Sequence, residues 1–227
     1  MEIPFKKADI LLPKNADMTK WSVIACDQYT SEPEYWKEVE EIVGDAPSTL
    51  KITLPEIYLE QENVSDRIVK INSEMEHLLD INFFKTLNNS LIYLERTCAD
   101  GKIRKGIIGK VDLEAYSYEK GSQTLIRATE GTVLERIPPR VKVRQNAKLE
   151  LPHVMLLIDD EKKEIIEGLS NKVSDEDIVY DFELMQNGGH VKGYRIPDNL
   201  VQNVFDGLEK LADKDNFETR YNVKDKG

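Results

Sequence analysis

The sequence predicts an α+β fold, a mixed sheet with β-hairpins and packed helices, which we expect to form a single domain over residues 1–227. Two pairs of strand-like segments flank glycine-containing turns, Asp100-Gly101 and Asn187-Gly188-Gly189, and such turns favour hairpins. Other segments repeat apolar residues at helical spacing. Strands and helices do not alternate regularly, and this mixture favours α+β over a parallel α/β sheet.

The strands are predicted from turn chemistry and short apolar runs. The first hairpin is expected to join Ser90–Thr97 to Ile103–Leu113, and the second to join Asp177–Met185 to His190–Ile196. In each turn, Gly follows Asp or Asn, because tight hairpin turns need residues that tolerate positive φ. Two more apolar runs, Lys51–Leu54 and Val154–Ile158, are typical of strands, and the second is predicted to be buried.

Three helices are indicated by start signals and by periodicity. The run Ser31-Glu32-Pro33-Glu34 has the pattern of a capping box with proline in the first turn, which predicts a helix from about Glu32 to about Val43. Ser65 is expected to cap a second helix and Asp198 a third. Their apolar faces consist of Ile68, Ile71, Met75, Leu78 and Leu79 in the second helix, and of Leu200, Val201, Val204, Phe205, Leu208 and Leu211 in the third.

The charge of the chain limits its partners. The 227 residues carry a net charge of −11 at pH 7, which argues against nucleic acid, because neutralising phosphates needs clustered Lys and Arg. A small-molecule substrate held in a local basic pocket stays compatible with this charge. The sequence shows no apolar run of membrane-spanning length and no targeting signal at its start, so we expect a cytoplasmic protein without a membrane partner. It leaves the oligomeric state open.

The sequence gives little indication of a metal site or of a reactive thiol. The histidines, His77, His153 and His190, are scattered, with no Cys or His at ligand spacing, so no structural metal is predicted. Mg²⁺ that arrives with a nucleotide stays open, because one or two carboxylates suffice to hold it. Cys26 and Cys98 are predicted to be reduced core thiols rather than reactive groups.

The first candidate site lies in Trp21–Trp36, WSVIACDQYTSEPEYW. The apolar run Val23–Cys26 is typical of a buried strand, and a helix start follows it closely. Asp27 would then lie at the tip of that strand, where α/β proteins tend to bind ligands. We expect its carboxylate to act as a base or as a Mg²⁺ ligand.

The second candidate site lies in Arg127–Asp159. Arg127, Glu130 and Thr132 belong to a turn whose hydroxyl and N–H groups can cradle an anion. A helix candidate then begins at Pro138-Pro139, and around it three arginines repeat every four residues, which puts them on one helix face. These three are Arg136, Arg140 and Arg144.

Two interpretations of this arginine stripe remain. Guanidinium groups bind phosphate or carboxylate in bidentate fashion, so the stripe can be an anion site. A charge run is also often a solvated helix face, here paired with nearby acids such as Glu130 and Glu135. Asp27 and Glu130 are the two acids that we expect to be catalytic. The sequence contains no Gly-rich phosphate loop of the common types and no nucleophile elbow.

Three segments of the chain resemble a bacterial family of uncharacterised proteins, the domain of unknown function 1015. These are WSVIACDQYTSEPEYW, RATEGTVLERIPPRVKVRQNAKLELPHVMLLIDD and the stretch Val179–Ile196. The family is similar to the ParB/sulfiredoxin-like superfamily, in which some relatives phosphorylate free L-serine to O-phosphoserine with a nucleotide donor. The resemblance therefore implies a ParB/sulfiredoxin-like fold and a kinase activity that uses a nucleotide with Mg²⁺.

The same resemblance implies a role for each candidate residue. Asp27 corresponds to a family motif at a strand end, and Glu130 to the acid of an Arg-x-x-Glu-x-Thr motif that begins at Arg127. Both acids would serve as acid/base groups or Mg²⁺ partners. The phosphates would be bound by a larger set, which comprises Arg127, Thr132, Arg136, Arg140 and Arg144. Phosphoryl transfer needs mostly positioning and charge neutralisation, and this set supplies both.

The chain departs from the family pattern in one respect. Full-length members carry a later Asp-Gly-(His or Asn)-His motif, which is not found before Gly227. The resemblance thus implies the N-terminal part of a longer protein, which we expect to be inactive by itself. Two functions remain open: part of a small-molecule kinase, or a non-catalytic ligand-binding or interaction domain. DNA binding by analogy with ParB is opposed by the charge.

Overall fold

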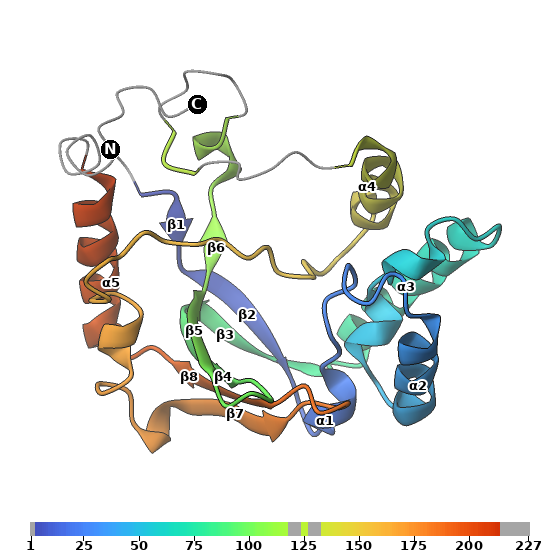
Figure 1. Cartoon of the computed structure of the whole chain (residues 1–227), viewed down its shortest axis with the longest axis horizontal. Helices are drawn as coiled ribbons and strands as arrows, with labels where there is room; N and C mark the ends of the chain where they lie inside the picture. The colour runs from blue at the N-terminus through green and yellow to red at the C-terminus, as the bar shows by residue number, and fades with distance from the viewer. Residues whose placement is uncertain (1–2, 118–123, 127–132, 214–227) are drawn as a thin grey trace.

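In the part of the chain that the structure describes, the strands pair into three antiparallel sheets, with helices on both sides of them (Figure 1). The computed structural model describes residues 3–117, 124–126 and 133–213. The strands are β1 (Phe5–Lys6), β2 (Ala8–Pro13), β3 (Phe84–Ser90), β4 (Ile92–Thr97), β5 (Ile103–Ile108), β6 (Lys110–Val111), β7 (Ile178–Glu183) and β8 (His190–Arg195). The α-helices are α1 (Met18–Trp21), α2 (Pro33–Val43), α3 (Val64–Asp80), α4 (Ile137–Gln145) and α5 (Asp198–Ala212). The predicted α+β class is confirmed.

The largest sheet has the strand order β5-β4-β8-β7 and contains both predicted hairpins. Its two central strands, β4 and β8, pair so that Leu94 lies opposite Gly193. The second hairpin turn requires glycine at position 189, which has a φ of +92°. A Cβ atom there would lie 2.0 Å from the carbonyl oxygen of Thr97, closer than any side chain permits. Both hairpin predictions are confirmed.

Two smaller sheets join the beginning of the chain to its middle. β2 pairs with β3, and β1 pairs with β6. Most of β3, whose sequence is FKTLNNS, was not predicted as a strand, since its polar residues resemble a loop. Tertiary pairing with β2, which lies more than 70 residues earlier, holds this segment extended.

The long helices form where apolar periodicity predicts them, but their caps differ. α2 begins at Pro33, and no side-chain cap hydrogen bond forms at its N-cap residue, Glu32. Ser65 lies inside α3 rather than at its cap, and Asp198 lies in the first turn of α5. The buried face thus determines where these helices form, and the capping signals locate their ends only to within one or two residues.

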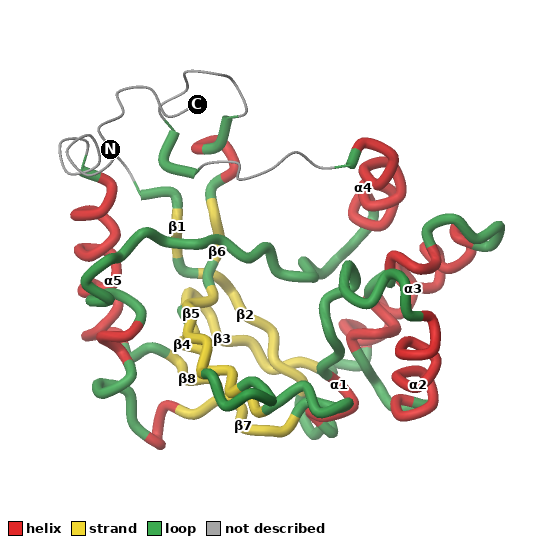
Figure 2. Tube along the Cα trace, in the orientation of Figure 1, coloured by secondary structure: helices red, strands yellow, loops and turns green. Residues whose placement is uncertain are grey.

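Three predicted strands are wrong. Val23–Cys26 is a loop between α1 and α2, in which the backbone N–H of Val23 donates to the hydroxyl of Thr49 instead of to a strand. Lys51–Leu54 overlaps a 3₁₀ helix, Thr49–Ile52, which Ser48 caps. Val154–Ile158 has no regular secondary structure and is exposed (Figure 2). Short apolar runs are compatible with a strand or with a packed loop, so their length and composition alone do not determine the secondary structure.

Buried apolar residues form separate clusters, and two of these clusters support the segments that carry the candidate site. One cluster lies around α3 and includes Trp21, Ile52 and Met75. Another lies against the buried face of α2, where Val39 and Val43 contact Met185. Among the described residues, every helix is too short or too polar to span a bilayer.

Candidate functional site

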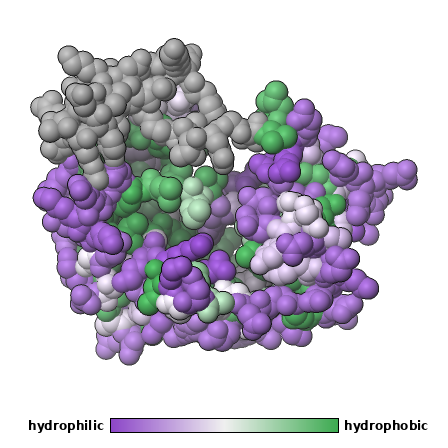
Figure 3. Space-filling view, viewed as in Figure 1, coloured by the Kyte–Doolittle hydropathy of each residue, from purple (hydrophilic) through white to green (hydrophobic). Residues whose placement is uncertain are grey.

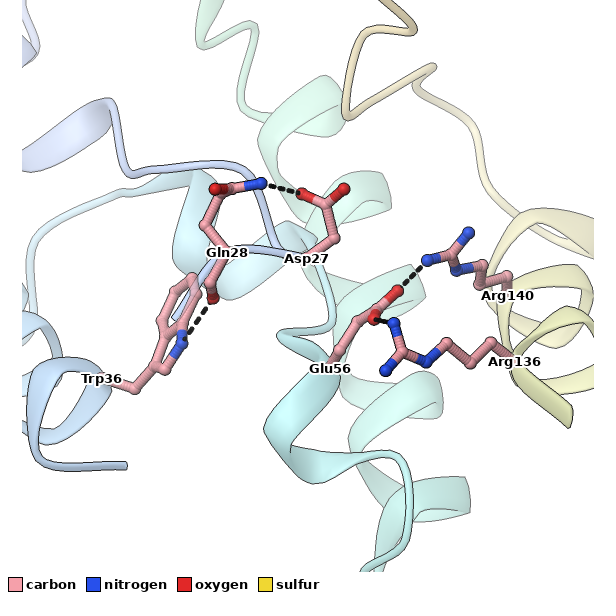
Figure 4. A network of polar contacts seen from close by, with 6 residues as sticks. All are labelled: Asp27, Gln28, Trp36, Glu56, Arg136 and Arg140. Atoms are coloured by element: carbon pink, nitrogen blue, oxygen red, sulfur yellow. Dashed lines mark hydrogen bonds and ion pairs between the residues drawn. The ribbon is translucent and has the colours of Figure 1, made fainter. Parts of the chain in front are cut away.

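A buried carboxylate lies at the centre of the candidate site. Glu56 begins a 3₁₀ helix, Glu56–Tyr58, and its side chain is only 4% exposed. One of its oxygen atoms contacts the guanidinium of Arg140, and the other lies 3.0 Å from Nη1 of Arg136 (Figure 4). The two arginine side chains are 44% and 45% exposed, respectively. The carboxylate is therefore buried behind two arginines that solvent can reach.

The two oxygen atoms of this carboxylate are not equivalent. Arg140 donates a hydrogen bond to Oε1 of Glu56. The contact of Arg136 with Oε2 has an ion-pair distance, but Oε2 accepts no hydrogen bond from any residue that the structure describes. Buried carboxylate oxygens are normally hydrogen-bonded, so Oε2 retains capacity for a donor or a cation.

The start of α4 explains why arginine side chains bind the carboxylate. Arg136 precedes the helix, and Pro138 and Pro139 lie in its first turn. These prolines set the helical φ but have no N–H, so the backbone offers fewer donors than a helix start normally does. Residues 136 and 140 are one turn apart, and both reach the same carboxylate. An anion at this end also interacts favourably with the helix dipole.

Apolar packing on the same side of α4 fixes the helix against the core. Val143 packs against the α3 cluster, as do Ala147, Leu149 and Leu151 in the segment that follows α4. Arg144, one turn beyond Arg140, pairs instead with Glu150 and donates to the carbonyl oxygen of Pro152. The arginine face of α4, by which we mean Arg136 and Arg140, is thus held in place, whereas Arg144 belongs to a separate ion pair.

A backbone hydrogen bond connects the loop that contains Asp27 to the segment that contains Glu56. The N–H of Glu56 donates to the carbonyl oxygen of Cys26 over 2.8 Å, which ties the loop of Asp27 to the start of the 3₁₀ helix. The side chain of Asp27 is exposed and accepts a hydrogen bond from the Gln28 amide (3.3 Å; Figure 4). Nε1 of Trp36 donates to the carbonyl oxygen of Gln28 over 3.2 Å and anchors this loop to α2. The expectation of a carboxylate at a buried strand tip is therefore wrong, because Asp27 lies in an exposed loop.

The surroundings of Cys26 disfavour the thiolate form of its side chain. Burial raises its pKa, and the negative charges of Asp27 and Glu56 raise it further, against a smaller opposite effect of Arg140. The thiol therefore stays protonated at neutral pH, and a protonated thiol is a poor nucleophile.

The structure brings some of the predicted residues together. Arg136 and Arg140 share one carboxylate, and Asp27 is tied to that carboxylate's backbone. Arg127, Glu130 and Thr132 lie outside the described residues. Among the described residues, the acid that pairs with Arg136 and Arg140 is Glu56, not the sequence neighbour Glu135 that a solvated helix face would use.

Glu56 is the residue that sequence reasoning missed. It pairs with Arg140, which is 84 residues away in the sequence, and local sequence patterns do not predict contacts at such a separation. The one available signal is an acid inside an apolar run, Ile52–Leu59, that is otherwise almost free of charge. Next to it, the buried Tyr58 hydroxyl donates to Glu40 (2.7 Å), and burial together with this bond raises the pKa of Tyr58 to about 12.

The described residues include no cluster of three or more His, Cys, Asp or Glu side chains that would hold a metal ion. A Mg²⁺ ion that accompanies phosphates needs only one or two carboxylates, because phosphate oxygens and water complete its shell. The carboxylate of Asp27 is exposed and could meet such an ion, whereas Oε2 of Glu56 is buried beside Arg136. A shallow hollow elsewhere, between β8 and α5, is lined by Lys7, Arg195 and Asp198 and contains none of the predicted site residues.

Comparison with known proteins gives a family but no function. No curated protein and no solved structure matches the chain. A family model described as "Protein of unknown function (DUF1015)" matches residues 3–213. The matched residues are most of the chain, and the chain therefore belongs to this family.

Proposed function

We propose that this chain is a ligand-binding domain for a phosphate-bearing small molecule, which binds at the arginine face of α4. The observation that supports this best is the convergence of Arg136 and Arg140 on one carboxylate. An oxyanion already lies between these guanidiniums. A phosphate group presents oxygen atoms of the same kind and carries more negative charge.

The two arginines retain hydrogen-bonding capacity. A guanidinium has five N–H donors, and among the described residues Arg140 donates only to Oε1 of Glu56. Both side chains are nearly half exposed, so a ligand reaches them without opening the core. Together they carry one positive charge more than Glu56 neutralises.

Asp27 gives the binding a further property. Its exposed carboxylate repels a phosphate near the arginine face, unless a cation compensates the charge. We therefore expect Mg²⁺ to strengthen binding of the phosphate-bearing ligand, with the exposed carboxylate of Asp27 as the protein group that faces the ion.

Arg140→Gln is expected to weaken binding of O-phospho-L-serine or ATP by about tenfold, the loss of one charge-assisted hydrogen bond. Isothermal titration calorimetry with each ligand, with inorganic phosphate, and with and without Mg²⁺, measures this. The matched control is Lys142→Gln, which removes the same charge from another exposed position of α4. Equal losses in both variants, or no loss in either, would contradict the proposed site.

A second candidate is the nucleotide-dependent phosphorylation of L-serine that the family resemblance implies, on a ParB/sulfiredoxin-like fold. The position of Asp27 favours it, because this carboxylate is exposed near the arginine face and pairs with no Lys or Arg among the described residues. In this role Asp27 would accept the proton of the substrate hydroxyl or hold Mg²⁺. Glu130 stays a proposed second acid.

Asp27→Asn is expected to slow such a reaction by about 100-fold, the usual contribution of a general base. Phosphorus NMR of the complete gene product and of this chain, each with ATP, Mg²⁺ and L-serine, would follow the O-phosphoserine signal. The control is Glu34→Gln, which removes an exposed acid from the first turn of α2. No O-phosphoserine from either protein would reject the kinase and leave the binding function standing.

A further inference from the structure

An open hollow of about 430 Å³ lies where the first half of α5 meets the ends of β3 and β8. Sites for small molecules have volumes of roughly 300–1,000 Å³, so the hollow is large enough for one. Its polar lining comes from the residue before β2, from β3 and from the last residue of β8. These residues are Lys7, Asn88, Asn89 and Arg195. None of them belongs to the arginine face of α4, so the hollow is a separate candidate site.

A bulge in β3 brings two consecutive amide side chains to this hollow. Neighbouring side chains in a regular strand point to opposite faces, so Asn88 and Asn89 would normally diverge. The register of β3 against β2 shifts by one residue at this point, and Asn89 has a φ of +48°. The N–H of Asn89 donates to the carboxylate of Asp9 over 2.7 Å and holds the bulge. Both amides therefore line the same hollow.

The guanidinium of Arg195 is held beside this bulge. Its Nε donates to the hydroxyl of Ser90 and its Nη2 to the carboxylate of Asp198, each over 3.3 Å. Ser90 is only 3% exposed, and its hydroxyl donates in turn to the carbonyl oxygen of Asn88. A guanidinium has five N–H donors, and among the described residues Arg195 uses two of them. The remaining donors are available to a ligand.

The other polar groups of the lining are also available. The ammonium of Lys7 makes no ion pair or hydrogen bond with any residue that the structure describes, and the same holds for the side-chain amides of Asn88 and Asn89. The described lining contains two cations, Lys7 and Arg195, and one acid, Asp198. This local excess of positive charge, in a chain with a net charge of −11, favours a ligand with a single negative charge.

One wall of the hollow is apolar. Val201 and Phe205, which are one turn apart on α5, line it and also pack in the core cluster that α5 covers. Figure 3 shows a polar surface over α5 on the face in view, as expected for a helix with one apolar side. Phosphate has no apolar part and carries nearly two negative charges, so it suits this lining less well than a carboxylate with an apolar body.

We propose that this hollow binds a small carboxylate with an apolar body. The carboxylate group lies between Lys7 and Arg195, where the amides of Asn88 and Asn89 donate to it as well. The apolar body packs on the wall that α5 supplies. The site is independent of the arginine face of α4, and it stands or falls separately from the phosphate ligand proposed there.

NMR of the ¹⁵N-labelled chain, titrated with sodium benzoate, tests the site through the Nε–Hε signal of Arg195, which an Arg195→Lys variant assigns. The titrated chain carries Arg140→Gln, which weakens competing binding at the arginine face. We expect a saturable shift with a dissociation constant on the order of 1 mM, because an open hollow buries only part of a small ligand. Benzamide, which lacks the charge, and acetate, which lacks the ring, should each bind more weakly. No saturable shift of Arg195, or equal binding of benzoate and benzamide, would overturn the proposal.

Two variants test the groups that contact the carboxylate. Lys7→Gln should weaken benzoate binding by about fivefold, the usual upper effect of one exposed charge. Its matched control is Lys85→Gln, at an exposed position of β3 outside the hollow. Asn89→Gly keeps the bulge, because glycine adopts a positive φ freely, but removes one amide and should weaken binding by about threefold. Equal affinities of the Lys7 and Lys85 variants, or an unchanged affinity of Asn89→Gly, would contradict the proposed contacts.

Discussion

Glu56→Gln is expected to raise the affinity of the arginine face for O-phospho-L-serine by about tenfold. In the native chain the carboxylate of Glu56 occupies both guanidiniums that the ligand needs. The amide removes the competing negative charge but keeps an oxygen that can accept from Arg140. Because both arginines are nearly half exposed, water screens part of this competition, and a larger effect is not expected.

This result distinguishes competition from a purely structural role of the ion pair. If Glu56 only held the arginines in place, its replacement would lower ligand affinity or leave it unchanged. The control is Asp45→Asn, which removes one negative charge at an exposed position that follows α2. Calorimetric titrations of the three proteins measure the effect. A Glu56→Gln affinity at or below that of the wild type would contradict competition.

Trp36→Ala is expected to lower the free energy of unfolding by about 3–5 kcal/mol. The indole of Trp36 is fully buried and packs edge-on against Tyr35, with 5.6 Å between ring centroids. Its removal leaves a large cavity on α2 and also removes the hydrogen bond to the carbonyl oxygen of Gln28. The loop that carries Asp27 thereby loses its anchor.

Urea denaturation followed by circular dichroism measures this loss. Trp36→Phe is the matched variant, because it keeps most of the buried ring but not the N–H donor. It should lower the free energy of unfolding by about 1 kcal/mol from the missing bond, plus a smaller packing loss. A loss below about 1 kcal/mol for Trp36→Ala would mean that the indole contributes less than its burial indicates.

The parts of the fold that could be predicted are those in which one local signal dominates. The Asp100-Gly101 turn specifies its hairpin through backbone conformation, and the apolar spacing of α3 from Ile68 to Leu78 is unambiguous. The strand predictions for Val23–Cys26 and Val154–Ile158 were wrong because no such local signal supported them. A run of four or five apolar residues indicates only that the side chains tend to be buried. Whether the backbone forms a strand or a loop depends on contacts with residues that are distant in sequence.

The candidate site shows the same division. The spacing of Arg136 and Arg140 was enough to place them on one helix face, because that depends on helical geometry alone. Their pairing with Glu56 could not be predicted from the sequence, because Glu56 belongs to a separate element 84 residues from Arg140. Arg144 continues the repeat in sequence, yet it binds Glu150, because the chain after α4 turns back beside it.

The most direct test of the binding proposal is NMR of the arginine Nε–Hε groups while the ¹⁵N-labelled chain is titrated with O-phospho-L-serine and Mg²⁺. Arg136→Lys and Arg140→Lys variants assign the two signals. We predict that the signals of Arg136 and Arg140 shift together and saturate, while that of Arg144 stays in place as the internal control. Saturable binding that leaves the Arg136 and Arg140 signals unmoved would contradict a ligand site on the arginine face of α4.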